Sequence, residues 1–142
     1  GMSDVVSALV QTIQEMKAKC RETGTPLIAI WVREPVLEVS RHGNGGRNSH
    51  LALLLAREMQ EMQGSEVAFL SAGSDGVDGN SKYAGAVVTS QSWRNGISLG
   101  LNPEKLLSQF DSAEFHEKMK GAVVTGPTGT NLTDLHLLWV EP

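Results

Sequence analysis

The feature that most constrains this fold is the alternation of helix-like and strand-like apolar patterns along the chain. Apolar side chains recur every three or four residues from Val6 to Cys20 and from Leu51 to Met62, which predicts two amphipathic helices that end near Gly24 and Gly64. Ser3 is the expected N-cap of the first helix. Short apolar runs predict strands at residues 26–32, 36–40, 66–72, 122–126 and 134–140.

Two shorter helices are expected in the C-terminal half, where Asn102 precedes Pro103 and where the string DSAE at 111–114 has the form of a capping box. The pattern of the string YAGAVVTS, at 83–90, fits neither a helix nor a strand better. Helices that alternate with short strands predict an α/β fold, a single-domain sandwich over 1–142 with a mixed β-sheet flanked by helices.

Composition narrows the class of protein. The chain has 142 residues, 40% of them hydrophobic, and a formal net charge of −4 without a block of like charges, which argues against a nucleic-acid or anionic-membrane surface. No apolar run approaches the ~20 residues of a membrane span, and the lone Cys20 on an apolar stripe indicates a buried thiol, so a cytoplasmic protein is expected. Gly1 has the form of a cloning remnant, with Met2 as the natural start of a complete chain.

The string GNGGRN, at 43–48, offers a candidate anion site. Glycines such as Gly45 and Gly46 let the backbone approach a ligand, and a helix that starts near Asn48 adds unpaired N–H groups and a favourable dipole. Arg47 would add a planar fork suited to a phosphate or carboxylate. The alternative is an ordinary glycine-rich turn in which Asn48 caps the helix and Arg47 lies in solvent; the composition leaves both open.

Two further loops carry polar side chains. The string GSDGVDG, at 73–79, places Asp75 and Asp78 where they could hold a divalent metal ion or bond to the turn backbone. The string TGPTGTNLTD, at 125–134, offers Thr128 and Asn131 as ligand-binding or structural groups. No Walker P-loop, calcium loop, zinc-binding histidine pair or GxSxG elbow occurs.

Three strings together resemble one known family. HGNGGRNSHLAL, LSAGSDGVDGNSKYAGAVV and AVVTGPTGTNLTDLHLLWV, in this order, look like the MOFRL domain, the C-terminal domain of the glycerate 2-kinase family, whose members are often labelled hydroxypyruvate reductases. The resemblance spans Pro26 to Val140. It implies phosphorylation of D-glycerate with ATP and Mg²⁺ in a cleft between this domain and a larger N-terminal one, with Arg47 and Glu34 matching family active-site residues.

The chain also departs from the family pattern. The family string GGET is VREP here, and Lys82 stands in place of a family aspartate. The N-terminal domain, which carries a catalytic lysine and much of the nucleotide site in the family, is not in this sequence, and half a cleft cannot position a γ-phosphate.

Three functions follow as hypotheses. The first is a stand-alone domain that binds a small anion, glycerate or phosphate, around Arg47 and is not a competent kinase alone. The second is one half of a split glycerate kinase whose N-terminal domain is separately encoded. The third is a structural or oligomerisation module without a ligand, in which a homodimer covers the apolar surface that would face the missing domain.

Overall fold

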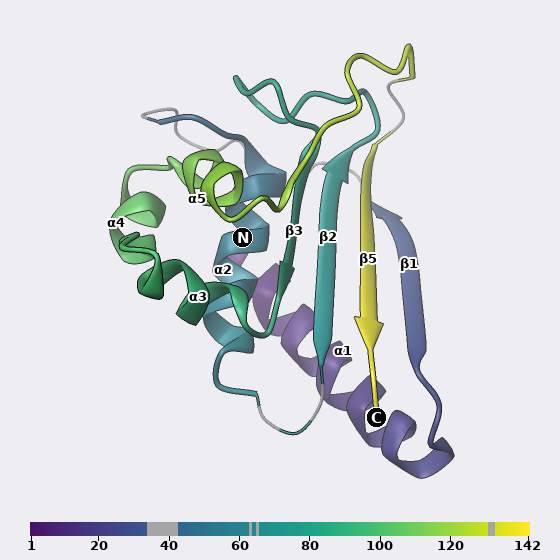
Figure 1. The fold of residues 1–142 in the computed structure, drawn as a ribbon. Coiled ribbons are helices and arrows are strands. Elements are labelled where there is room, and N and C mark those ends of the chain that lie inside the picture. The colour runs from purple at the N-terminus through teal and green to yellow at the C-terminus, as the bar shows by residue number, and fades with distance from the viewer. Residues whose placement is uncertain (34–42, 63, 65, 131–132) are drawn as a thin grey trace.

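The computed structural model describes residues 1–33, 43–62, 64, 66–130 and 133–142. The helices are α1 (Met2–Thr23), α2 (Arg47–Met59), α3 (Ser92–Ser98), α4 (Pro103–Ser108) and α5 (Ser112–Lys118). The strands are β1 (Leu27–Arg33), β2 (Val67–Gly73), β3 (Gly85–Thr89), β4 (Ala122–Val123) and β5 (Asp134–Val140). They form one sheet in the order β1-β5-β2-β3-β4. Figure 1 labels the first four strands of this order.

The α/β class is confirmed, but the prediction of a mixed sheet is wrong, because every described strand pair is antiparallel. β1 and β2 run in the same direction and are connected through α2, as in a parallel unit. They do not pair with each other, since β5 from the end of the chain lies between them and pairs with both. The strand itself was predicted at 134–140, but its place between β1 and β2 depends on contacts between residues far apart in the chain, which a local pattern does not contain.

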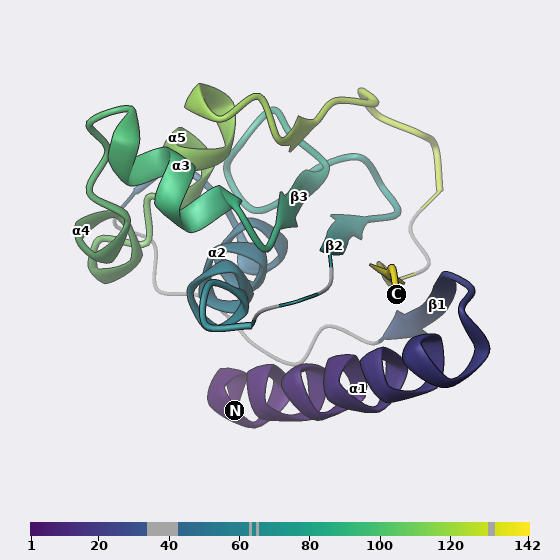
Figure 2. The same ribbon diagram turned by 60° about the horizontal axis from the view of Figure 1, so that its bottom comes forward.

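The molecule has two layers. Figure 2 shows α1 and α2 side by side on one face of the sheet, with α3, α4 and α5 grouped at the end of the sheet that carries β3 and β4. Fully buried Ile13 of α1, Leu55 of α2, Phe69 of β2 and Leu138 of β5 belong to the core between the layers. Along β5 every second residue is buried, as expected of a strand with one face on a core.

Most helix boundaries follow the sequence prediction. Gly24 ends α1 in the left-handed conformation with φ 71°, and the Asn102 side chain accepts a hydrogen bond from Lys105 N at 3.2 Å at the start of α4. Ser3, predicted as the N-cap of α1, lies inside that helix, which has Gly1 as its N-cap.

The structure also contains elements that the sequence did not predict. α3 has a glycine in its middle, Gly96, which lowers helix propensity, and a Cβ at this position would overlap the ring of Phe115. The string at 83–90 contains β3, and the strand predicted at 36–40 lies outside the described residues. Among the helices that the structure describes, none is long and apolar enough to cross a membrane.

Candidate functional site

The first turn of α2 binds a carboxylate of the protein itself. Asp78, from the loop after β2, accepts hydrogen bonds from Gly46 N at 3.1 Å, Asn48 N at 3.0 Å and Ser49 N at 2.8 Å. Its Oδ2 also accepts a bond from Ser49 Oγ at 2.5 Å. Asp78 is almost fully buried, so this internal carboxylate satisfies the free N–H groups of the helix and interacts favourably with its dipole.

The glycines of the string GNGG allow this loop to pack closely on the loop that carries Asp78. A Cβ at Gly46 would lie 2.5 Å from Asp78 Oδ1, and a Cβ at Gly79 would lie 2.5 Å from Gly45 O. Gly45 N donates to Asn80 Oδ1 at 2.9 Å, and Asn80 Nδ2 donates to the carbonyl oxygen of Gly43 at 3.0 Å. The close backbone approach that these glycines permit is therefore made to another part of the same chain.

Arg47 forms a bidentate ion pair with Asp134, the first residue of β5. The Nε and Nη2 atoms of Arg47 lie 2.6 and 2.8 Å from the two carboxylate oxygens of Asp134. Asn48 Nδ2 donates to the same carboxylate at 3.3 Å, and Asn48 Oδ1 accepts a bond from Ser71 Oγ at 2.7 Å. The Arg47 side chain is 34% exposed, whereas that of Asp134 is 6% exposed, so the carboxylate fixes the guanidinium from the interior.

The charges around Arg47 are mainly negative. The hydrogen bond to Asp134 raises the pKa of Arg47 above its usual value, against the opposing effect of burial, and the charges of Asp134, Asp78 and Asp75 act in the same direction as the hydrogen bond. The two bonds to Asp134 use two of the five N–H groups of the guanidinium. The remaining three make no hydrogen bond to any residue that the structure describes.

The predicted anion site is therefore divided. The backbone N–H groups of Gly45, Gly46 and Asn48, predicted to face a ligand, are bonded to Asn80 and Asp78. Of these residues, Arg47 has side-chain N–H groups that are bonded to none of the residues the structure describes.

The two other predicted loops are bonded to each other. Thr128 Oγ1 donates to Ser74 O at 2.5 Å, and Thr128 N donates to the Asp75 carbonyl oxygen at 3.3 Å. A Cβ at Gly76 would overlap the carbonyl oxygen of Gly126. Thr128 thus lies next to Asp75 as a structural link between the loops, whereas the predicted site residues Glu34 and Asn131 lie outside the described residues.

The loop carboxylates show limited capacity for a metal ion. Both oxygens of Asp78 already accept hydrogen bonds, while Asp75 uses one oxygen to accept a bond from Val77 N at 3.0 Å. Within the described part of the chain, no group of three His, Cys, Asp or Glu side chains is placed to hold a metal. A Mg²⁺ site at Asp75 and Asp78 stays a prediction, and the bonds of Asp78 weigh against that residue as a ligand.

Two histidines pack next to the start of α2, and the sequence did not indicate this structural role. His116 of α5 is buried, its Nε2 lies 2.8 Å from Ser49 O, and burial lowers its pKa to about 4. Because a carbonyl oxygen only accepts, Nε2 carries the proton of a neutral ring. His50 stacks on Phe110 with ring centroids 4.8 Å apart, and burial lowers its pKa too.

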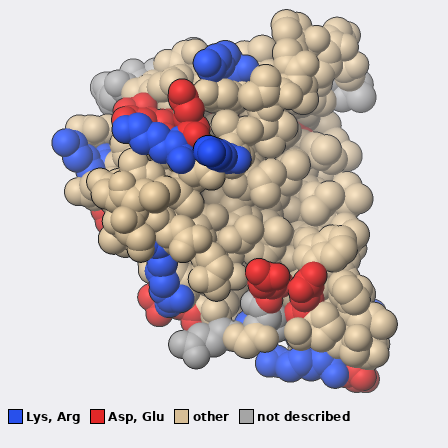
Figure 3. Space-filling view, viewed as in Figure 1, with Lys and Arg blue, Asp and Glu red and all other residues tan. Residues whose placement is uncertain are grey.

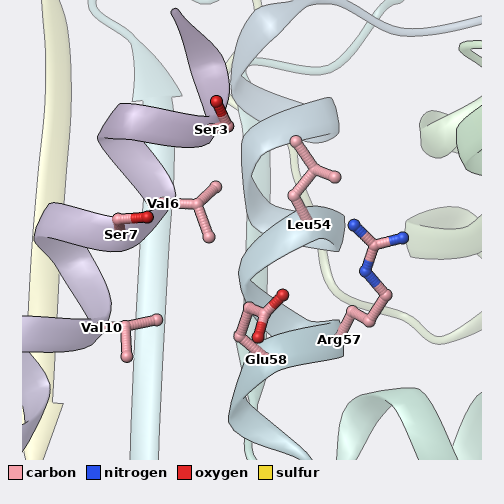
Figure 4. Close-up of a pocket in the computed structure, with 7 residues that line it drawn as sticks. All are labelled: Ser3, Val6, Ser7, Val10, Leu54, Arg57 and Glu58. Carbon is pink, nitrogen blue, oxygen red and sulfur yellow. The ribbon is translucent and has the colours of Figure 1, made fainter.

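A groove between α1 and α2 lies apart from these loops. It has a volume of about 390 Å³ and is lined by Ser3, Val6, Ser7, Val10, Leu54, Arg57 and Glu58 (Figure 4). None of the predicted site residues lines it. Arg57, at its rim, pairs with Glu104 at 3.1 Å.

Comparisons with known proteins agree with this architecture. The MOFRL family pattern matches residues 27–134. D-glycerate 2-kinase from Thermotoga maritima is 35% identical over 127 residues, which are 89% of this chain and 30% of that protein. Human glycerate kinase is 38% identical over 114 residues, 77% of this chain and 22% of the relative.

Solved structures extend the likeness to the fold. The crystal structure of Thermotoga maritima glycerate kinase superposes with a TM-score of 0.83 at 33% identity, covering 96% of this chain and 33% of that one. A Pyrococcus horikoshii protein superposes with a TM-score of 0.79 at 26% identity. The chain thus spans between about a fifth and a third of the length of these relatives. The family pattern and the shared fold cover most of the described residues, including the α2 and β5 ends that hold Arg47 and Asp134, and the chain belongs to the MOFRL family.

Proposed function

We propose that this chain binds a small anion, D-glycerate or phosphate, through Arg47, as one side of a glycerate-kinase type of pocket. The observation that carries the proposal is the bonding of the guanidinium. Asp134 accepts from its Nε and Nη2, and yet the side chain is 34% exposed and three of its N–H groups bond to no residue in the described part of the chain. A guanidinium held on one edge presents its other edge in a fixed orientation, which suits a carboxylate or phosphate.

The local charge limits what the chain does alone. Asp134, Asp78 and Asp75 all act on Arg47, so from the described residues near Arg47 an incoming anion meets more negative than positive charge. Transfer of a phosphoryl group from ATP requires positive charge around the γ-phosphate, which Mg²⁺ would supply. In the described loop, the carboxylate oxygen of Asp75 that does not accept from Val77 N could serve as a ligand of this ion. We therefore propose that the chain alone is not a competent kinase.

Titration of D-glycerate and of inorganic phosphate, followed by calorimetry and chemical-shift perturbation, tests the anion site. We expect binding to the natural protein and at least about tenfold weaker binding to Arg47→Lys, because lysine keeps the charge but not the planar fork. At 100 times its dissociation constant the ligand should add about 2.7 kcal/mol to the free energy of unfolding.

Arg57→Lys is the matched control, since Arg57 lies on the same helix, is 37% exposed and also pairs with a carboxylate. Binding that is equal in both variants would contradict the site. If neither D-glycerate nor phosphate binds, the remaining hypothesis is a structural module without a ligand. The backbone N–H groups that are bonded to Asn80 and Asp78 favour this alternative.

A second candidate function is one half of a split kinase. This function is favoured by the small part of each relative that the chain matches, which is 22% of human glycerate kinase and 35% of the macaque glycerate kinase. Mixing this chain with a separately expressed N-terminal domain of a relative, ATP and Mg²⁺ should then restore phosphorylation of D-glycerate, and Arg47→Lys should abolish the gain. Activity of this chain without the added domain would contradict the proposal.

We also propose a cytoplasmic location, supported by Cys20. The thiol is fully buried in the core, with Sγ 3.3 Å from the carbonyl oxygen of Val140, and it is the only cysteine of the sequence. A structure that depends on a buried free thiol suits a reducing compartment.

A further inference from the structure

The face of the sheet opposite α1 and α2 carries an uncharged, largely apolar surface, which we call the open face. It consists of the outward side chains of β1, β5, β2 and β3, and Figure 3 shows it as a tan expanse bordered by charged groups. Its most exposed members lie on β1, where Ile30 and Val32 are each 62% exposed. A contiguous exposed apolar surface of this kind on a folded domain marks an interaction site.

The strand register arranges the side chains of the open face into three rows, and side-chain size differs between the two ends of each row. Residues opposite each other in antiparallel strands share a face, so each row crosses all four strands. From β1 to β3 the rows are Ile28-Trp139-Ala68-Thr89, Ile30-Leu137-Leu70-Val87 and Val32-Leu135-Ala72-Gly85. In every row the larger side chains stand on β1 and β5, and the smaller or equal ones stand on β2 and β3.

We propose that the open face binds a second copy of this chain, around a two-fold axis that runs parallel to the strands between β5 and β2. This axis reverses each row of one copy over the same row of the other, so that large side chains meet small ones: Trp139 lies over Ala68, and Ile28 lies over Thr89. The rows therefore complement themselves, a property that a two-fold interface requires and that another partner would not.

The shape of the face agrees with this axis. A hollow of about 300 Å³, lined by Glu66, Val67, Ala68, Thr89 and Trp139, indents the β2–β3 half at the end of the first row. The axis places Ile28 of the partner over Thr89 at this hollow, and Ile28 is 52% exposed. The three rows contain no charged residue, so face-to-face packing leaves no charge unpaired in the centre. The exposed Glu66 lines the hollow at the end of the first row, where its carboxylate can stay in solvent at the rim of the interface.

The expected area suits a reversible dimer. Four strands about 4.8 Å apart and about 23 Å long give a face on the order of 450 Å² per copy. The total of about 900 Å² lies near the lower limit for a specific protein interface. We therefore expect a dimer that dissociates in the micromolar range, independently of whether Arg47 binds an anion.

Sedimentation velocity from 1 to 200 µM tests the dimer. The natural chain of 15.3 kDa should shift from one copy to two over this range. Ile30→Glu puts a carboxylate in the middle row and should weaken association at least 100-fold. Leu99→Glu, at an equally exposed position at the end of α3, should leave it unchanged. A monomer at 200 µM, or a dimer that survives Ile30→Glu, overturns the proposal.

Cross-linking tests the axis. The proposed axis places Ile30 over Val87 of the partner, whereas an axis across the strands would place Ile30 over Ile30. Because packed sheets lie about 10 Å apart, a bismaleimide of similar reach is used in place of a disulfide. Ile30→Cys and Val87→Cys chains should cross-link when mixed and not when each is alone, while Cys20 stays buried and unreactive. Efficient cross-linking of Ile30→Cys alone would overturn the axis.

Discussion

Asp78→Ala is expected to lower the free energy of unfolding by about 4 kcal/mol, because it leaves four donors without their acceptor in a buried site. Three of these donors are backbone N–H groups at the start of α2, where the negative charge of Asp78 also opposes the positive end of the helix dipole. Water cannot easily replace the carboxylate, since the side chain is almost fully buried. Urea denaturation followed by circular dichroism measures the change.

Asp75→Ala is the matched control for this experiment. Asp75 belongs to the same loop, but its side chain accepts only one bond in the described structure, from Val77 N, so its removal should cost at most about 1 kcal/mol. Asp78→Asn separates charge from size, because it keeps one acceptor oxygen and should retain part of the stability. Equal losses for Asp75→Ala and Asp78→Ala would show that the α2 cap does not depend on the Asp78 carboxylate.

Acidification is expected to destabilise the protein through His116. Burial lowers the pKa of His116 from 6.5 to about 4, so the folded state keeps the ring neutral while the unfolded state takes up a proton below pH 6.5. The unfolded state thus binds more protons, and stability falls as the pH falls through this window. Between pH 7.5 and 5 the loss from this group is about 2 kcal/mol, and it reaches about 3 kcal/mol by pH 4.

The pH dependence of His116→Gln checks this assignment. Glutamine can still donate an N–H group to the Ser49 carbonyl oxygen but does not titrate, so the free energy of unfolding should change less between pH 7.5 and 5. His50→Gln is the comparison, because the pKa of His50 is also lowered and its proton uptake on unfolding has the same sign. An unchanged pH slope in His116→Gln would mean that the buried ring is not the group that titrates.

The glycine-rich loop illustrates how far sequence analysis reaches at this site. Glycines before a helix indicated an anion at the start of α2, and a carboxylate does lie there. The residue that supplies this carboxylate, Asp78, is 30 residues away from Asn48 in the chain. No local sequence pattern distinguishes a carboxylate of the protein from one of a ligand. The sequence indicated that the start of α2 needs an anion, but it did not identify Asp78 as the residue that provides it.

The same limit applies to Arg47 and to the sheet. The sequence singled out Arg47 as a planar donor, but its partner Asp134 lies 87 residues further along the chain, at the start of a strand whose place in the sheet was unknown. The sheet was predicted to be mixed because helices alternate with strands. It is antiparallel because β5 lies between β1 and β2, and this depends on where the end of the chain returns.

The sequence alone determined the positions of most helices and strands, the α/β class and the membership of the MOFRL family, because periodicity, helix ends and short motifs act over a few residues. The tertiary structure decided which groups neutralise one another: Asp78 caps α2, Asp134 holds Arg47, and the three rows of the open face come into register. These are contacts between residues far apart in the chain. Their free energy depends on distance and burial, which only the folded path of the chain sets.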